Sequence, residues 1–143
     1  MNSWIGYNSK FKNKPFFPHG PRGIFVSGGA SIGMDAVIFQ QVTIGSNTLR
    51  GSKNFGSPTV GDNVYIGAGA KIIGNIKIGN NCRIGANAAV YSDMPDNSVA
   101  VQSPTRIIEK DKQLDNRYYS QHNGVWGFYE NGEWKEISEN LSK

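Results

Sequence analysis

The stretch from residue 60 to residue 90 repeats with a strict period of six, and this period limits what the chain can fold into. Cut into hexads it reads VGDNVY-IGAGAK-IIGNIK-IGNNCR-IGANAA-V, with an aliphatic residue opening every hexad. An α-helix needs apolar residues every three or four positions and a half-buried strand needs them every two, so a period of six fits neither. It fits a chain that turns a corner every six residues, with three hexads in each coil.

Two sets of side chains are expected to point into this coil, while Gly, Asn and Asp supply the corners because they adopt positive φ at little cost. The first and fifth places of the hexads hold Val60, Val64, Ile66, Ala70, Ile72, Ile76, Ile78, Cys82, Ile84, Ala88 and Val90. The same register runs from Val26 to Ile44 and then breaks. The break, 46–57, is polar and Gly-rich, so we expect an extruded loop, which solenoids often use for binding. The sequence therefore predicts an all-β fold, a parallel β-helix of hexapeptide repeats.

Changes of composition divide the chain into three segments. Residues 1–18 mix aromatics, Lys and Pro without periodicity and are expected to form a lead-in. Residues 19–108 are predicted to form the β-helix domain, and 109–143 a C-terminal extension. Within the extension, 125–137 is predicted to be a β-hairpin around an Asn-Gly turn. A lone hairpin is marginal, so its aromatic residues are expected to pack on the coil or on a neighbouring subunit.

Composition excludes several classes of function. The 143 residues carry a net charge of +4, with a pI of about 9.2, but the basic residues are scattered, so we expect no nucleic-acid partner. A single cysteine gives neither a disulfide framework nor a zinc cluster, and we expect no metal. The chain has no apolar stretch of about 18 residues and no apolar signal-peptide core. We therefore expect a cytoplasmic protein without a membrane span.

The run from His19 to Ile108 resembles the left-handed β-helix acyltransferases, nearest to serine acetyltransferases and their relatives in surface-polysaccharide pathways. The resemblance is carried by PTVGDNVYIGAGAKIIGNIKIGNNCRIGANAAV, with FPHG upstream and DMPDNSVAVQSPTRII downstream. It implies a left-handed coil, a homotrimer, and acetyl-CoA as the donor, bound in the cleft between adjacent subunits. None of these three properties follows from the periodicity.

His19 is the candidate catalytic base. Acyl transfer from a thioester requires the attacking hydroxyl to lose its proton, and a neutral imidazole can take that proton at pH 7. His19 matches the position where the resembled enzymes place their base, whereas His122 matches nothing. Cys82 occupies an inward fifth place, so we interpret it as a buried filler and expect no covalent intermediate.

A donor groove is expected along one corner of the coil. Ala68 and Ala86 are one full coil apart, and Pro104 continues the spacing. Small side chains there leave a strip for a pantetheine arm, although corner sterics alone would also favour them. The resemblance makes these positions acetyl-CoA contacts. It also makes Arg106 the candidate for a CoA phosphate, with Lys71 and Lys110 as weaker candidates.

Departures from the serine acetyltransferase pattern bear on the acceptor. Ser57 stands where those enzymes place a second histidine, and no acidic residue precedes Asp35 to orient His19. Those enzymes also carry a long helical N-terminal domain, whereas eighteen residues precede His19. On these grounds we expect an O-acetyltransferase acting on a sugar or surface-polysaccharide precursor, with serine as the alternative acceptor. Asn47, Phe55 and Ser57 are the candidate acceptor-binding residues.

Two other classes of β-helix protein bear on this expectation. A γ-type carbonic anhydrase shares the β-helix but needs three histidines around zinc, and the chain has two. A non-catalytic β-helix that serves as a binding module is the second alternative. Such a module has no need of an imidazole at the mouth of the coil and would not bind CoA.

Overall fold

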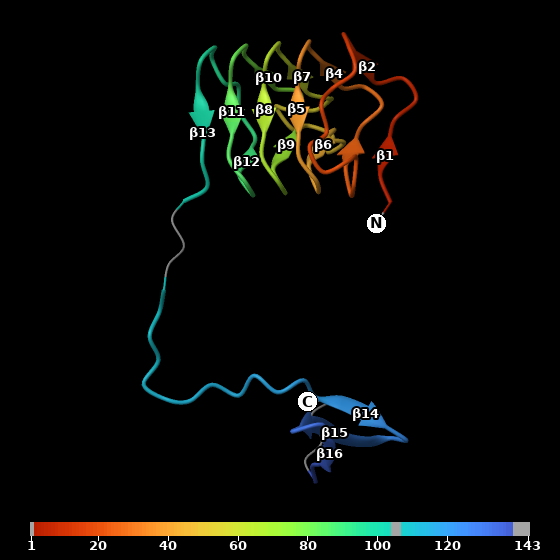
Figure 1. Ribbon diagram of the computed structural model, residues 1–143, viewed down its shortest axis with the longest axis vertical. Helices are drawn as coiled ribbons and strands as arrows, with labels where there is room; N and C mark the ends of the chain where they lie inside the picture. Colours follow the sequence, from red (N-terminus) through yellow and green to blue (C-terminus); the bar gives the residue numbers. More distant parts are fainter. Residues whose placement is uncertain (1, 104–106, 139–143) are drawn as a thin grey trace. The chain divides into compact units, whose positions relative to one another are not determined.

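The computed structural model describes residues 2–103 and 107–138. The chain divides into two compact units, residues 1–104 and 105–143, which are described separately. Figure 1 shows the first unit as a stack of coils and the second as a small sheet. Among the described residues, no helix has the length and apolar character needed to cross a membrane.

Three parallel sheets form the walls of the first unit, and successive coils add short strands to them, five to the first wall and four to each of the other two. The first wall contains β1 (Trp4–Ile5), β3 (Phe25–Val26), β6 (Thr43–Gly45), β9 (Lys71–Ile73) and β12 (Ala89–Val90). The second contains β2 (Lys10–Phe11), β4 (Ser31–Ile32), β7 (Thr59–Val60) and β10 (Lys77–Ile78). The third contains β5 (Val37–Ile38), β8 (Tyr65–Ile66), β11 (Arg83–Ile84) and β13 (Val99–Ala100). The expected parallel β-helix is confirmed.

The core is a set of aliphatic columns that run along the inside of the coil. Ile38, Ile66 and Ile84 are paired in register across the third wall and are 0% exposed. The first and fifth places of the hexads are buried throughout the repeat, Cys82 included. Each aliphatic side chain therefore packs on the equivalent residue of the coils before and after it, which fixes the register between coils.

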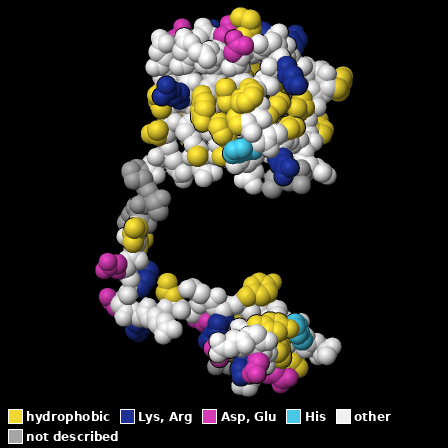
Figure 2. Space-filling view, viewed as in Figure 1, with side chains coloured by type: hydrophobic (Ala, Val, Ile, Leu, Met, Phe, Trp, Pro, Cys, Tyr) yellow, Lys and Arg dark blue, Asp and Glu magenta, His cyan; other side chains and the backbone are white. Residues whose placement is uncertain are grey.

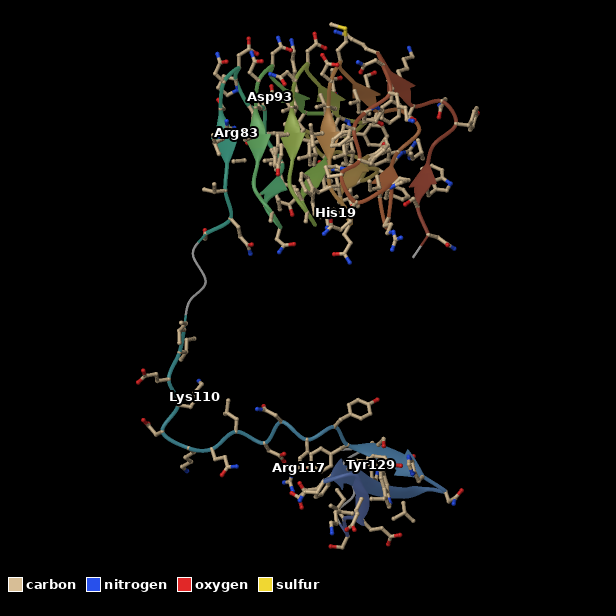
Figure 3. All side chains as sticks on the ribbon, in the orientation of Figure 1. His19, Arg83, Asp93, Lys110, Arg117 and Tyr129 are labelled. Carbon is tan, nitrogen blue, oxygen red and sulfur yellow. The ribbon has the colours of Figure 1, made fainter. Side chains whose placement is uncertain are left out.

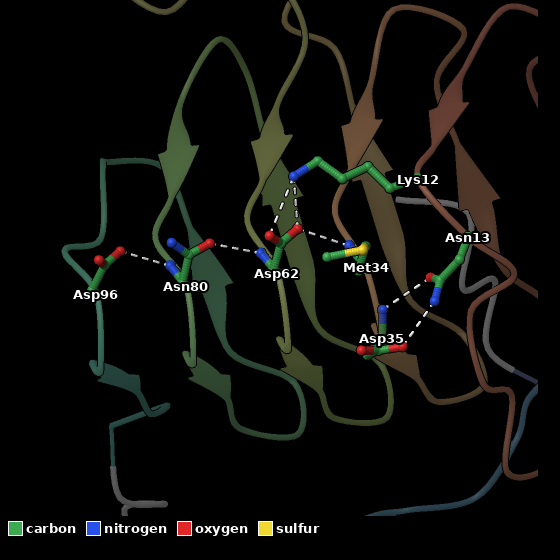
Figure 4. Close-up of polar contacts among 7 residues, drawn as sticks. All are labelled: Lys12, Asn13, Met34, Asp35, Asp62, Asn80 and Asp96. Atoms are coloured by element: carbon green, nitrogen blue, oxygen red, sulfur yellow. Dashed lines mark hydrogen bonds and ion pairs between the residues drawn. The ribbon is translucent and has the colours of Figure 1, made fainter.

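One corner of the coil carries a ladder of side-chain acceptors, shown in Figure 4. The backbone N–H of Asp62 donates to Oδ1 of Asn80 over 2.8 Å, and that of Asn80 donates to Oδ1 of Asp96 over 2.7 Å. Asp62 Oδ1 itself accepts the N–H of Met34 and the ammonium of Lys12. The Lys12 hydrogen bond, followed by that of Met34, lowers the pKa of Asp62 below its usual value. Backbone donors left over by the turns are thus satisfied from the next coil.

The first coil begins before His19, which differs from the expected lead-in of residues 1–18. Strand β1 pairs with β3, and β2 pairs with β4. Ile5, Phe11 and Phe17 keep the six-residue spacing, and Phe11 and Phe17 pack against the core. The period was missed because aromatic residues replace the aliphatic ones and no glycine follows them.

The segment 46–57 leaves the wall after β6 through a narrow neck. Asn47 and Gly56 exchange two backbone hydrogen bonds of 2.9 Å across this neck. The loop then folds back on the coil, because the carbonyl of Asn54 accepts the N–H of Asn75 and its amide nitrogen donates to the carbonyl of Tyr91. The coil resumes at β7.

The second unit is an antiparallel sheet of β14 (Ser120–His122), β15 (Val125–Glu130) and β16 (Glu133–Glu136). Two Asn-Gly pairs make the turns, at 123–124 and 131–132, and all four residues have positive φ. This is the backbone that two-residue hairpin turns require. Only the second of these turns was predicted from the sequence. Strand β14 makes this a three-stranded sheet, and three strands are more stable than an isolated two-stranded hairpin.

Candidate functional site

His19 lies at the corner that follows the third-wall segment of the first coil, and its side chain is exposed. The bridge between Phe16 and Val37 brings its segment against the third wall, and a hydrogen bond from Gly20 N–H to Phe17 O closes the turn. The edge of the imidazole meets the ring of Phe39, with centroids 5.5 Å apart. In Figure 2 the histidine of the first unit borders a hydrophobic patch, and Figure 3 labels it at the edge of the coil. A solvent-accessible imidazole is thus held beside aromatic side chains.

Gln40 orients this imidazole. Its Oε1 lies 2.7 Å from Nδ1 of His19. An amide oxygen only accepts hydrogen bonds, so with this oxygen facing the ring Nδ1 carries the proton and Nε2 keeps its lone pair. The orienting group that the sequence did not provide as an upstream acid is therefore a neutral amide from the following coil.

The base stands on the same corner as the expected donor strip. Counting two residues onward from the paired Ile38, Ile66 and Ile84 gives Gln40, Ala68 and Ala86. Backbone hydrogen bonds link this row, since Gly69 N–H donates to Gln40 O over 3.0 Å and Asn87 N–H donates to Ala68 O over 2.9 Å. The two alanines present only methyl groups, so the row leads from His19 along a corner without large side chains.

A cavity of about 560 Å³ lies beside the base. It is lined by His19, Arg22, Gln40 and Gln41. Gln41 takes a positive φ of 62°, and its N–H donates to the carbonyl of Arg22 over 2.9 Å. The ammonium of Lys71 donates to the carbonyls of Gly69 and Gln41. One candidate base, one permanent cation and two amides therefore surround a space open to small molecules.

A larger cavity of about 790 Å³ lies in the second unit, along residues 113–118 and against Tyr129 and Glu130. One of its two acids, Asp115, is hydrogen-bonded to Arg117 and Tyr119, and the Arg117 bond holds the pKa of this carboxyl well below its usual range. A carboxylate so engaged is a poor proton acceptor. His19 is therefore a better candidate for a general base than Asp115.

The candidate acceptor residues of the loop make their hydrogen bonds away from the cavity that His19 lines. Ser57 Oγ is 2.6 Å from Ser46 Oγ, which donates to the buried Ser27 over 2.8 Å. Asn47 uses its side chain inside the loop, on Ser52 Oγ and Leu49 N–H. Phe55 is 55% exposed. No hydrogen bond or ring contact found within residues 2–103 connects Asn47, Phe55 or Ser57 to His19.

The remaining expected residues fall elsewhere. Pro104 and Arg106 lie outside the described residues. Lys110 belongs to the second unit, as Figure 3 shows. His122 stacks on Trp134 with ring centroids 3.9 Å apart, which is a packing role. In the part of the chain that the structure describes, no three His, Cys, Asp or Glu side chains are placed to hold a metal ion.

Comparison with known proteins identifies the repeat and its relatives. The family of bacterial transferase hexapeptides (six repeats) matches residues 57–92. A serine acetyltransferase of Helicobacter pylori is 41% identical over 98 residues, which is 68% of this chain and 55% of the relative. That of Staphylococcus xylosus is 35% identical over 128 residues, 90% of this chain and 57% of the relative. The chain thus spans little more than half the length of these relatives.

A solved structure agrees. Serine acetyltransferase of Neisseria gonorrhoeae in complex with serine superposes with a TM-score of 0.59 and 33% identity, over 70% of this chain and 39% of that one. The expected left-handed coil is therefore confirmed.

The expected sugar acceptor is wrong, because the relatives and solved structures found are serine acetyltransferases. The prediction gave too much weight to Ser57 and to the missing upstream acid, which are changes at single positions. The structure provides another orienting group in Gln40. Residues 57–92 belong to the bacterial transferase hexapeptide repeats, and the first unit is a left-handed β-helix of the kind that serine acetyltransferases carry.

Proposed function

We propose that the protein transfers the acetyl group of acetyl-CoA to the side-chain hydroxyl of serine. The observation that carries this proposal is the His19–Gln40 hydrogen bond beside a cavity, on a coil similar to those of serine acetyltransferases. The similarity supports the donor and the acceptor, and the tautomer of His19 supports the role of base.

The reaction is a direct transfer. Nε2 of His19 takes the proton of the serine hydroxyl while the hydroxyl oxygen attacks the thioester carbonyl. The tetrahedral intermediate collapses by breaking its C–S bond, and the imidazolium returns the proton to the departing sulfur. The side-chain oxygen of Gln40 accepts the hydrogen bond of Nδ1–H throughout the reaction, so the ring keeps its orientation. General-base assistance of this kind contributes about 10²–10⁴ in rate.

The donor is proposed to lie along the corner of Ala68 and Ala86, with its thioester at His19. Lys71, Lys110, Pro104 and Arg106 remain candidates for contacts with CoA. The loop residues Asn47, Phe55 and Ser57 remain candidates for the acceptor.

A homotrimer is the proposed assembly. Phe16 and Tyr65 both pair with Val37 on the third wall, the ring of Tyr65 contacts that of Phe39, and Phe16 and Tyr65 are 65% and 45% exposed. An aromatic patch of this kind is costly to leave in water. In a trimer, the β-helix of a neighbouring subunit packed on this patch would cover it and close the site. Light scattering should give three times the mass of the chain, and a monomer would contradict this assembly.

The deciding experiment compares the two histidines. Thiol release from acetyl-CoA with L-serine should fall by about 10²–10⁴ in His19→Ala. His122→Ala, which removes the other histidine, should keep wild-type turnover. Circular dichroism checks that both variants are folded. Equal activity of His19→Ala and wild type would overturn the proposed base, and no turnover of serine by the wild type would overturn the proposed acceptor.

A further inference from the structure

We propose that Arg22 binds the carboxylate of the acceptor, so that the cavity beside His19 selects a hydroxy acid. This inference rests on the proposed acetylation of serine. It assigns to the site a residue that neither the hexad period nor the family pattern indicates.

The lining of the cavity carries the argument. Of its four residues, Arg22 alone bears a permanent charge. A guanidinium matches a carboxylate in shape, because its two parallel N–H groups meet the two oxygens. The two glutamine residues are neutral, so they contribute no charge that would compete with Arg22 for the carboxylate.

The guanidinium of Arg22 is available for a ligand. The ion pairs found among the described residues join Lys12 to Asp62, Arg117 to Asp115 and Lys135 to Glu133, so none of them uses Arg22. A positive charge outside the ion pairs of the described residues, placed at the rim of a cavity, raises the local concentration of anionic ligands.

The backbone under Arg22 is fixed. Gly20 and Gly23 take φ values of 70° and 62° on either side of it. The N–H of Arg22 donates to Gly20 O over 2.8 Å, and its carbonyl accepts the N–H of Gln41. Ser3 Oγ also donates to the carbonyl of Pro21. The side chain therefore starts from a defined point next to the His19–Gln40 pair.

Serine is so small that the group that binds its carboxylate and the base that takes its hydroxyl proton must lie close together. Its hydroxyl and its carboxylate are carried by adjacent carbons, so the group that binds the carboxylate must share a cavity with the base that takes the hydroxyl proton. The phosphates of CoA, by contrast, are separated from the reacting thioester by the whole pantetheine arm. A cation beside His19 is thus placed for the acceptor rather than for the donor.

The test compares L-serine with L-serinamide, which keeps the hydroxyl and amine but lacks the carboxylate. In Arg22→Gln the KM for L-serine should rise about tenfold or more, as expected for loss of a charge-assisted hydrogen bond. The KM for acetyl-CoA should stay unchanged, and the preference of the wild type for serine over serinamide should disappear. Arg22→Lys, which keeps the charge without the fork, should retain part of the preference.

Other results would overturn the inference. An equal loss with serine and serinamide would make Arg22 structural, and a rise in the KM for acetyl-CoA but not for acetyl-dephospho-CoA would assign it to the 3′-phosphate of the donor.

Calorimetric titration with L-serine in the presence of CoA separates this inference from the proposed function. Serine that binds through Arg22 without being acetylated would leave the carboxylate site standing and remove the activity. Acetylation that is indifferent to Arg22→Gln would do the reverse, and absence of both binding and turnover would remove both.

Discussion

His19 and Gln40 are joined across two successive coils by a hydrogen bond of 2.7 Å between Nδ1 and Oε1. The pair presents an imidazole in the tautomer of a general base without a carboxylate behind it. An acid in that position would stabilise the imidazolium more strongly than an amide does. The amide therefore fixes the direction of the ring without placing a negative charge beside it.

The first prediction tests this positioning role. Gln40→Ala should lower kcat about tenfold or more, because the ring loses its fixed tautomer. Gln40→Glu should keep the orientation, and since a nearby carboxylate favours the protonated ring, the acidic limb of the pH–rate profile should move to higher pH. Gln113→Ala, a change in the second unit, serves as the control. An unshifted limb in an active Gln40→Glu enzyme would contradict the role.

The second prediction concerns the donor strip. Ala86→Leu places a branched side chain on the corner row, so the KM for acetyl-CoA should rise about tenfold while the KM for serine stays unchanged. Ala89→Leu makes the same change on the outer face of β12, away from this corner, and should leave both constants as they are. Equal kinetics of Ala86→Leu and wild type would move the pantetheine arm to another corner.

The third prediction concerns the core column. Ile66 is 0% exposed and packs between Ile38 and Ile84. Ile66→Ala should lower the free energy of unfolding by about 2–5 kcal/mol, since it removes buried methyl groups and leaves a cavity. Denaturant titration measures the loss. Ile66→Val should cost about 0.5–1.5 kcal/mol, and similar losses for both variants would argue against a tightly packed column.

The period of six predicted the core because its physical cause is local: every sixth side chain enters the same column. It did not reveal the first coil, where Phe11 and Phe17 take the inward places and neither is followed directly by Gly. There the aromatic rings hide the pattern, although Ile5 begins it at the right spacing. A search that accepted any large apolar residue at the sixth place would have found this coil.

The site was partly predictable. Ala68 and Ala86 follow from counting coils, but Gln40 follows only from the strand pairing, because the extruded loop lengthens its coil from 18 to 28 residues. Arg22 was not predictable, because its place depends on a turn between two glycines with positive φ, outside the repeat. The predicted acceptor was wrong because it rested on Ser57 and on a missing upstream acid, whereas the sequence of the whole β-helix is similar to serine acetyltransferases.

The last prediction uses the corner ladder. Hydrogen bonds from Lys12 and Met34 lower the pKa of Asp62 in the folded protein, so the folded state binds this proton less readily than the unfolded chain. The carboxylate therefore stabilises the fold above the usual pKa of about 4, and this contribution is lost as the pH falls from there through the lower, folded value.

Asp62→Asn keeps an acceptor for Met34 but not the charge for Lys12. Its Tm should lie slightly below that of the wild type at pH 7, the effect being small because the pair is exposed, and the two values should converge below pH 4. Asp111→Asn, outside the ladder, should show no such convergence. A difference between Asp62→Asn and wild type that persists at pH 2 would show that the charge of Asp62 is not what the ladder uses.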